Sequence, residues 1–278
     1  MKDRIILCAG EGARFKCMCE GLCGAGRVFC MGERAAGTEV IASPEEMPFP
    51  ADVLVLQMMC RGTEVCGMSF GQLTEKLKPS GTVLGGRLTA EQREFFEGRG
   101  FGCADYFGSE SLMIKNCIPT AEGALMIALR ETADTVFGSR VLITGWGRTA
   151  KCCARLFKAA GATVTVAARK QSAMAEVWAE GMAGVSIAKL SSAAEMSDII
   201  INTVPALVLT EEVLAYVKPD SLIIDLASGE GGTDFTAAKV KGIKAILAPG
   251  LPAKTAPRTA GLLLAEEICG KLSERSEK

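Results

Sequence analysis

The run Val141-Leu142-Ile143-Thr144-Gly145-Trp146-Gly147-Arg148-Thr149-Ala150 decides the fold of this chain. Four residues typical of a buried strand lead into G-x-G-x-x-A, and a helical pattern follows, which Gly161 closes. In this context Gly145 permits a tight turn, Gly147 lets a pyrophosphate approach the backbone, and Ala150 allows close packing of helix and strand. The start of the helix supplies amide donors and a positive dipole end. The run therefore predicts a dinucleotide-binding loop.

Strand and helix patterns alternate along the chain from residue 139 onward. Helical patterns such as Thr149–Ala160 and Thr210–Val217 lie between six apolar, β-rich runs. These runs are Val141–Thr144, Thr163–Ala168, Val185–Ala188, Asp198–Asn202, Ser221–Ala227 and Ile243–Leu247. Six strands with helical crossovers predict an α/β fold with a doubly wound parallel sheet, the Rossmann architecture.

The first 118 residues predict a smaller α/β domain. A helix is expected at Thr89–Glu97, and strands at Arg4–Cys8, Arg27–Cys30, Val53–Gln57 and Thr82–Leu84. The turn Gly10-Glu11-Gly12 follows the first of these strands. It is open to two interpretations, a plain connection between strand and helix, which we favour, or a second nucleotide loop.

Two further helices connect the domains. An apolar stripe predicts a long bridging helix from Thr120 to about Val136, with Pro119 near its start. A second helix is expected over Thr259–Leu272. We therefore predict residues 1–118 as a substrate domain and residues 119–255 as the dinucleotide-binding domain. Residues 256–278 are expected to pack back on the first domain, so that a cleft lies between the two.

The composition excludes several classes of protein. The net charge of −1 gives no electrostatic attraction for nucleic acid or for an anionic membrane. The apolar run Ile5–Ala9 is too short for a signal peptide, and no run approaches the roughly 20 apolar residues of a membrane helix. We expect a cytoplasmic protein. Its 12 cysteines are then reduced thiols that serve as small apolar residues, and no metal site is expected.

The chain contains no histidine. This excludes catalysis by Ser-His-Asp or Cys-His arrangements, and any dehydrogenase mechanism that relies on a histidine base. Acid–base chemistry must therefore use Lys, Asp, Glu, Tyr, Cys or water.

The end of the second Rossmann strand indicates which dinucleotide is bound. An NAD-specific domain places an acidic residue there, whereas this chain has Arg169 and Lys170, with Ser172 close by. A guanidinium can grip a 2′-phosphate with two hydrogen bonds, which favours NADP. In the alternative interpretation, Arg169 stacks on the adenine or points into solvent.

Polar loops follow three consecutive strands at the carboxyl edge, where ligands bind in open α/β sheets. Asp225 can either contact the cofactor or brace the glycine-rich loop that follows it. We predict cofactor contacts from Gly145, Trp146, Gly147, Arg148, Thr149, Arg169, Lys170, Ser172, Asn202, Thr203, Val204, Pro205, Asp225, Ala227 and Ser228.

A set of motifs between about residues 116 and 265 resembles the family of dipicolinate synthase A subunits. The motifs occur in the order and spacing of that family, whereas residues 1–115 match it more loosely, mainly at the Gly10–Arg14 turn. They are Asn116-Cys117-Ile118-Pro119-Thr120-Ala121-Glu122-Gly123, the Gly145–Thr149 loop, Ile201-Asn202-Thr203-Val204-Pro205, Asp225-Leu226-Ala227-Ser228, Gly231-Gly232-Thr233-Asp234-Phe235 and Ala248-Pro249-Gly250-Leu251-Pro252, then Ala256-Pro257 and Thr259-Ala260-Gly261.

The resemblance implies that NADP accepts a hydride from dihydrodipicolinate, or from its hydroxylated precursor, to give the dipicolinate of endospores. It also implies that the partner is a flavoprotein-like B subunit and that the location is the mother cell of a sporulating bacterium; a homo-oligomer stays open. On matching positions, Asn116, Thr120 and Arg258 are candidates for holding the carboxylates of the substrate. Glu122 is a candidate base, or a first-turn residue that only favours the helix dipole.

The chain departs from the family pattern at several positions. Glu230 stands where the family has proline, Arg258 where lysine is commoner, and Lys254 in a loop expected to be apolar. Arg87 has no counterpart that the resemblance can place. Two alternatives therefore stay open, a non-catalytic NADP-sensing subunit and another two-domain NAD(P)-dependent dehydrogenase of small carboxylates. A shikimate-type enzyme would need a Lys–Asp pair that we cannot locate in the first domain.

Overall fold

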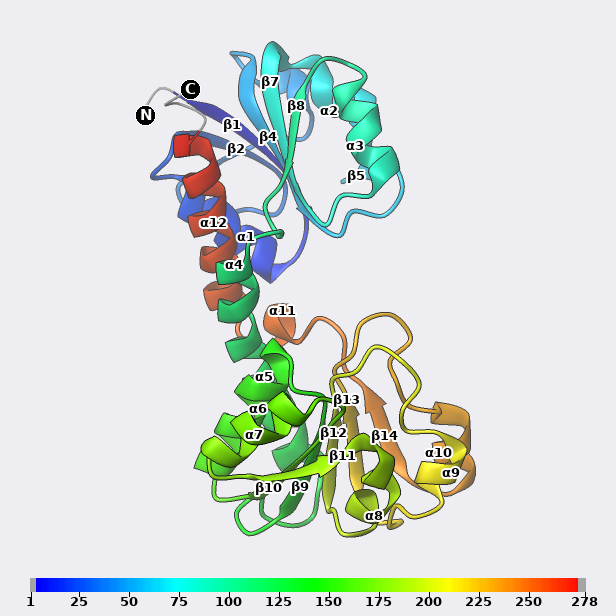
Figure 1. The fold of residues 1–278 in the computed structure, drawn as a ribbon. Coiled ribbons are helices and arrows are strands. Elements are labelled where there is room, and N and C mark those ends of the chain that lie inside the picture. Colours follow the sequence, from blue (N-terminus) through cyan, green and yellow to red (C-terminus); the bar gives the residue numbers. More distant parts are fainter. Residues whose placement is uncertain (1–3, 275–278) are drawn as a thin grey trace. The chain divides into compact units, whose positions relative to one another are not determined.

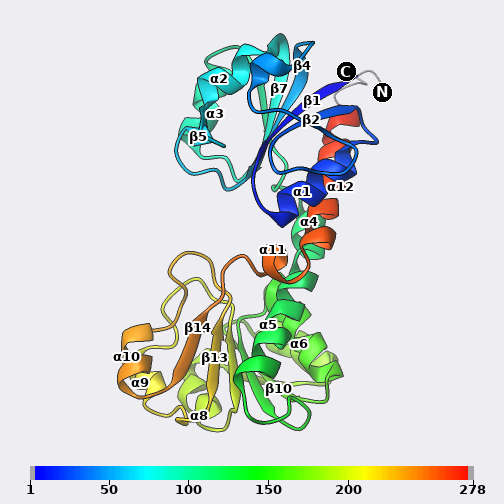
Figure 2. The same cartoon turned by 180° about the vertical axis from the view of Figure 1, so that it is seen from behind.

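The computed structural model describes residues 4–274 of the chain. These residues form two compact units, shown from opposite sides in Figures 1 and 2. Unit 1 combines the described residues up to Asn116 with those from Ala256 onward, and unit 2 spans Cys117–Thr255. Each unit is built on its own six-stranded sheet.

Unit 2 has the strand order β11-β10-β9-β12-β13-β14, and all of its neighbouring strands are parallel. This order confirms the predicted doubly wound fold. The strands are β9 (Arg140–Thr144), β10 (Thr163–Ala168), β11 (Ala183–Ser186), β12 (Ile199–Asn202), β13 (Leu222–Asp225) and β14 (Lys244–Leu247).

Helices cover both faces of this sheet, because alternate residues of each buried strand point to opposite sides. Val141 and Ile143 pack toward α5, α6 and α7, whereas Leu142 packs toward α8, α9 and α10. The first three helices span Cys117–Glu131, Arg148–Ala159 and Gln171–Ala179. The others span Leu190–Glu195, Glu211–Leu214 and Phe235–Val240, with the 3₁₀ turn η2 (Ile187–Lys189) and α11 (Leu251–Thr255) completing the unit.

Unit 1 repeats the same topology, since its order β3-β2-β1-β4-β7-β8 places the six strands in the same sequence order as in unit 2. The sequence predicted four of these strands. The additional strands β3 and β8 are short and lack a strong β-rich pattern. The strands are β1 (Ile5–Gly10), β2 (Arg27–Gly32), β3 (Glu39–Val40), β4 (Ala51–Met58), β7 (Leu77–Gly86) and β8 (Gly102–Asp105).

One face of the unit 1 sheet is covered by α1 (Ala13–Leu22), α4 (Glu110–Lys115) and α12 (Pro257–Glu274). The other face carries α2 (Phe70–Glu75) and α3 (Ala90–Glu97), together with the 3₁₀ turn η1 (Pro44–Glu46) and the hairpin of β5 (Glu64–Val65) and β6 (Met68–Ser69). Helix α12, the last element of the chain, packs along α1, the first helix (Figure 2).

The predicted bridging helix begins and ends earlier than expected. Helix α5 begins at Cys117 and ends at Glu131, not at Val136, because the Thr132 hydroxyl donates to the Ala128 carbonyl and closes the last turn. With α4 it forms a helical stretch, Glu110–Glu131, that by length and composition alone could cross a membrane. Ala124 and Ala128 of α5 are fully buried in the core of unit 2, as in a core helix of an α/β unit.

Candidate functional site

The glycine loop after β9 has the geometry that a dinucleotide requires. Gly145 has a φ of 87°, and a Cβ there would lie 2.9 Å from Thr203 Oγ1, so no other residue fits without strain. Gly147 caps α6 without a side-chain hydrogen bond, and nothing lies within 4 Å of the place its Cβ would occupy. No side chain caps the start of α6 and no atom crowds Gly147, so the loop fits a pyrophosphate.

Neighbouring side chains fix the two ends of this loop. The Trp146 indole donates a 2.9 Å hydrogen bond to Glu176 Oε2, to which Lys151 also donates at 2.7 Å. These hydrogen bonds hold the pKa of Glu176 below its usual value. Thr149 Oγ1 lies 3.5 Å from Cys117 Sγ, so the start of α5 lies beside the first turn of α6.

The residues after β10 form the basic side of the site. Strand β10 pairs with β9, with Ala167 opposite Thr144, so Arg169 and Lys170 leave the sheet beside the glycine loop. Both are exposed, and within residues 4–274 neither forms an ion pair. Lys170 caps α7 without a side-chain hydrogen bond, and Ser172 is exposed in the first turn. The group therefore offers two unpaired charges and a hydroxyl to a phosphate.

A buried network lies behind the ends of β12 and β13. Asn202 accepts a hydrogen bond from the Thr144 hydroxyl and donates one of 3.0 Å to Asp225 Oδ1. Asp225 is fully buried and also accepts from the amides of Ala227 and Gly232 and from the hydroxyl of Thr233. Each carboxylate oxygen then has two donors, which leaves no lone pair for a ribose hydroxyl. The structure therefore favours the brace over cofactor contact for Asp225.

The other predicted cofactor residues lie at the same edge of the sheet. Thr203 is half-buried and donates a 2.7 Å hydrogen bond to the carbonyl of Thr144, which joins β12 to the glycine loop. Ala227 is buried, Val204, Gly145 and Trp146 are half-buried, and Gly147, Arg148, Pro205 and Ser228 are exposed.

The four predicted substrate residues are divided between the units. Asn116 ends α4 and Arg258 is exposed in the first turn of α12, both in unit 1. Thr120 and Glu122 lie on α5, in unit 2. Glu122 is exposed on the face that carries Leu125, Met126 and Leu129, whereas the alanines of α5 face α6. Within unit 2, Glu122 therefore lies on a different face of α5 from the alanines, which pack on α6 beside the glycine loop. Its role as a base stays a prediction.

The glycine turn of unit 1 differs from that of unit 2 in ways that disfavour a nucleotide. The Gly12 amide donates to Glu33 Oε1 at 3.2 Å, and the Glu11 amide donates to Gln57 Oε1 at 2.8 Å. A carboxylate therefore occupies the place where phosphate would bind. Phe15 stands where unit 2 has Ala150, and a Cβ on Gly10 would lie 2.8 Å from its ring. This favours the interpretation as a plain connection.

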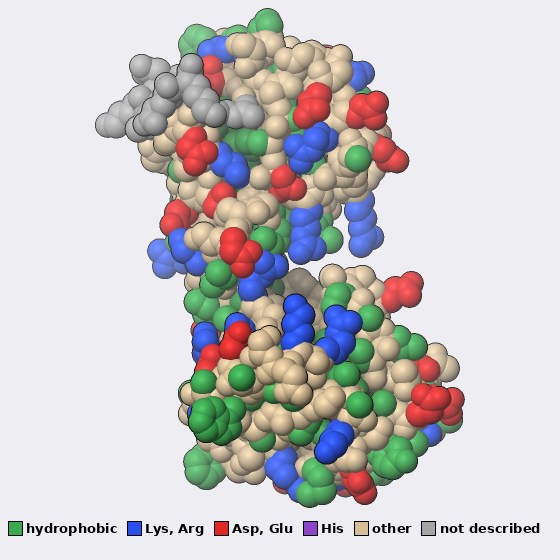
Figure 3. Space-filling model, in the orientation of Figure 1, with side chains coloured by type: hydrophobic (Ala, Val, Ile, Leu, Met, Phe, Trp, Pro, Cys, Tyr) green, Lys and Arg blue, Asp and Glu red, His purple; other side chains and the backbone are tan. Residues whose placement is uncertain are grey.

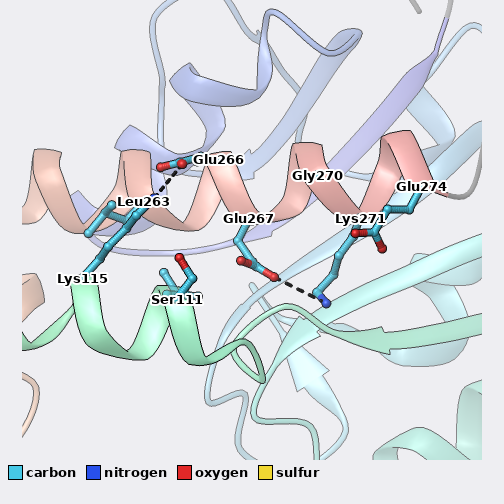
Figure 4. A pocket seen from close by; sticks show the side chains of 9 residues that line it. Ser111, Lys115, Leu263, Glu266, Glu267, Gly270, Lys271 and Glu274 are labelled. Carbon is cyan, nitrogen blue, oxygen red and sulfur yellow. Dashed lines mark hydrogen bonds and ion pairs between the residues drawn. The ribbon is translucent and has the colours of Figure 1, made fainter. Parts of the chain in front are cut away.

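Two other groups in the described part of the chain offer no reactive site. Figure 4 shows a pocket between α4 and α12, where Lys115 pairs with Glu266 at 2.7 Å and Lys271 with Glu267 at 3.5 Å. The first pair joins α4 to α12, and the second lies within α12. Cys19 and Cys30 have their sulfurs 3.5 Å apart, and their hydrogen bond together with burial raises the pKa of the Cys30 thiol. Residues 4–274 contain no cluster of Cys, Asp or Glu that could hold a metal ion.

Part of unit 2 resembles a known cofactor-binding domain. Residues 122–232 match the model of the NAD-binding domain of D-isomer-specific 2-hydroxyacid dehydrogenases. The A subunit of dipicolinate synthase from Bacillus subtilis (strain 168) is 44% identical over 168 residues, which are 60% of this chain and 57% of that protein. The sequence match thus spans little more than half the length of this relative.

Two solved structures are similar over nearly the whole chain. The A subunit of dipicolinate synthase from Bacillus halodurans has a TM-score of 0.87 at 30% identity, covering 98% of both chains. The dipicolinate synthase A chain from Bacillus subtilis has a TM-score of 0.85 at 31% identity, covering 100% of this chain and 98% of that one. The similarity therefore includes unit 1, where the sequence motifs were weak.

Proposed function

Because this chain belongs to the family of dipicolinate synthase A subunits, we propose that it oxidises dihydrodipicolinate, or its hydroxylated tetrahydro precursor, to dipicolinate with NADP+. One hydride and one proton leave the dihydropyridine ring, and the hydroxylated precursor first loses water. We assign the binding of NADP to unit 2 and the binding of substrate to unit 1. The observation that carries the proposal is the open glycine loop of unit 2 with the unpaired Arg169 and Lys170 beside it.

The residues of unit 2 suit NADP in each of its parts. The start of α6 would hold the pyrophosphate, because Gly147 brings no capping side chain and leaves room for the phosphates to approach the backbone. Arg169, Lys170 and Ser172 would hold the 2′-phosphate, since no carboxylate pairs with the two cations. Thr203 and Val204 would flank the nicotinamide at the end of β12. When bound, NADP+ supplies the hydride acceptor.

The chain has little acid–base chemistry to perform in this reaction. Formation of an aromatic pyridine ring supplies much of the driving force, so the protein mainly positions the substrate and excludes water. The ring proton can pass to water or to a carboxylate, because the chain has no histidine. The substrate is a dianion, which calls for cationic side chains around it.

The family also suggests where and with what the chain works. We propose that it acts with a flavoprotein-like B subunit, in the cytoplasm of the mother cell of a sporulating bacterium. These assignments rest on the family resemblance, and co-purification of the chain with the B subunit tests the first of them.

The experiment mixes the purified chain and its B subunit with enzymatically generated dihydrodipicolinate, and follows dipicolinate by its ultraviolet absorbance. We expect product with NADP+ and much less with NAD+, and loss of product in Gly147→Val, which fills the open loop. An Arg258→Ala variant tests the assignment of that residue to the substrate. Measured NADP+ binding without product would overturn the synthase proposal in favour of a sensing subunit or another dehydrogenase.

A further inference from the structure

The carboxyl edge of the unit 1 sheet carries strained, exposed residues at the ends of two adjacent strands. Met59 follows β4 with a φ of 60°, and Arg87 follows β7 with a φ of 57°, a conformation that side chains other than glycine and asparagine rarely adopt. The Met59 amide donates to the carbonyl of Gly86 at 2.8 Å, so the two residues lie side by side. Met59 is 54% exposed, which leaves an apolar surface beside the Arg87 guanidinium.

Arg87 and Arg14 converge on the segment Tyr106–Phe107. The guanidinium of Arg87 lies over the ring of Phe107, 5.1 Å from its centroid. A Cβ on Gly86 would lie 2.6 Å from the ring of Tyr106, so this ring packs directly behind the end of β7. Arg14, in the first turn of α1, is close enough to Tyr106 for a charge interaction. In Figure 3, several Lys and Arg side chains project from the lower side of unit 1 as it is drawn.

Arg14 is half-buried, yet within residues 4–274 it has neither a hydrogen-bond partner nor an ion-pair partner. Burial lowers its pKa, because no carboxylate offsets the cost of removing the charge from water. Buried charges in proteins are nearly always paired. An unpaired, half-buried guanidinium at the carboxyl edge of a parallel sheet is therefore suited to bind an anion.

The acidic residues of this edge are directed elsewhere. Glu33 accepts the Gly12 amide, and Asp105 accepts the Phe107 amide at 2.7 Å. Within residues 4–274 neither of them, nor the exposed Glu11, forms an ion pair with an arginine. Gln57, at the end of β4, has its oxygen fixed by the Glu11 amide. Its NH₂ group has no partner in the described part of the chain and adds a neutral donor at the same edge.

We propose that Arg14, Gln57 and Arg87 form the site in unit 1 that binds the substrate's carboxylates, with Met59 against the face of its ring. The inference rests on the proposed function for the identity of the ligand, a flat ring with two carboxylates. Each arginine holds one carboxylate through a charge-assisted pair of hydrogen bonds, and the Gln57 amide donates to one of them. The site explains Arg87, for which the family resemblance offered no role.

The test measures binding of dipicolinate and of picolinate, which has one carboxylate, to the full chain by titration calorimetry. The variants are Arg14→Lys, Arg14→Gln and Arg87→Asn; asparagine tolerates the left-handed conformation of residue 87 and removes its charge. Arg34→Gln, an exposed arginine after β2, is the matched control, and Arg258→Ala tests the rival site. Melting curves and NADP+ affinity verify that each variant is folded.

We expect Arg14→Gln and Arg87→Asn to bind dipicolinate about 10- to 100-fold more weakly, the loss of a charge-assisted hydrogen-bond pair. Picolinate lacks one of the two carboxylates. If an arginine pairs with that carboxylate, then combining picolinate with the variant that lacks this arginine should weaken binding no more than either change does alone. Arg14→Lys should recover part of the affinity, and the control should be unchanged.

Equal affinity of both arginine variants and wild type overturns the inference, and so does an effect confined to Arg258→Ala. A wild-type chain that binds neither ligand overturns it as well. The proposed function is decided separately, because dipicolinate production with NADP+ can succeed or fail whatever these affinities are.

Discussion

The amide of Asn202 donates a 3.0 Å hydrogen bond to Asp225 Oδ1, and this contact joins the ends of β12 and β13 behind the cofactor loop. Both side chains are fully buried. Through Thr144, which donates to Asn202, the network continues to the end of β9. Three neighbouring strand ends are thus held in register by one buried carboxylate and its donors.

Asp225→Asn tests this brace. Its new NH₂ group would face the Gly232 amide and the Thr233 hydroxyl, both of which now donate to the carboxylate. We expect a loss of about 2–4 kcal/mol in the free energy of unfolding, because buried donors lose their acceptor. Denaturant unfolding measures it, with the exposed Asp220→Asn as a control that should change stability by less than about 0.5 kcal/mol. Equal stability of the two variants would contradict the brace.

The two glycines of the cofactor loop should respond differently to alanine. At Gly147 the φ is ordinary and a Cβ meets nothing, so Gly147→Ala should fold normally but project a methyl toward the pyrophosphate. At Gly145 the positive φ makes Gly145→Ala destabilising by about 1–2 kcal/mol. Thermal unfolding and NADP+ titration separate the two effects. Weak binding by Gly147→Ala together with an unchanged melting temperature is the expected signature, and unchanged binding would refute the open-loop assignment.

Much of unit 2 could be predicted from the sequence because its central strands are buried on both faces. Such strands are nearly continuous apolar runs, as in Ile199–Asn202 and Leu222–Asp225. Unit 1 was harder to predict. Its strand Gly102–Asp105 has no β-branched residue, and helix Ala13–Leu22 buries a stripe that is partly built of cysteine and methionine. The two units share one topology, but their sequences show no repeat that would have predicted it.

The cofactor loop could be located from sequence because it is local, with all of its functional positions inside one strand–turn–helix. The bracing role of Asp225 could not be decided, because its donors come from β12 and from a loop up to eight residues away. Arg14 and Arg87 were present in the sequence, but the finding that neither forms an ion pair within residues 4–274 is a property of long-range packing. Only the structure reveals that Glu33 and Asp105 turn to backbone amides instead.

Arg169 should decide the choice between NADP and NAD. Removing its charge in Arg169→Ala should weaken NADP+ binding about 10- to 100-fold, because a charge-assisted contact to the 2′-phosphate is lost. NAD+ has no such phosphate, so its affinity should change little. Fluorescence or calorimetric titration with both dinucleotides measures the ratio, with the exposed Lys239→Ala on α10 as control. A parallel loss for both dinucleotides would mean that Arg169 contacts the adenine rather than the phosphate.

Acid should weaken unit 2 through Asp198. Burial acts to raise the pKa of this carboxyl, but hydrogen bonds from Lys218 and Arg140 outweigh it and lower the pKa to about 2. A lowered folded-state pKa stabilises the fold above the unfolded value near 4, and this stability is lost as the pH falls toward 2. Asp198→Asn should therefore be less stable at pH 7 by about 1 kcal/mol, after screening, and equal to wild type near pH 2. Melting temperatures across that range measure the convergence, and a pH-independent difference would contradict it.

Two glycines of α12 allow a last test, in which the same substitution should have opposite effects on unit 1. Gly261 lies where α12 crosses α1, and a Cβ there would be 2.4 Å from the Arg14 carbonyl oxygen, so Gly261→Ala must push the helices apart. Overpacking of this kind costs about 1–3 kcal/mol. Gly270 has nothing within 4 Å, and Gly270→Ala should stabilise the helix by about 0.5–1 kcal/mol through propensity alone. Denaturant unfolding of both variants gives the sign of each change.

Because Gly261 contacts the residue that we assign to carboxylate binding, Gly261→Ala should also weaken dipicolinate binding, whereas Gly270→Ala should not. Two variants with the same sign in stability would mean that α12 does not pack on α1 as described.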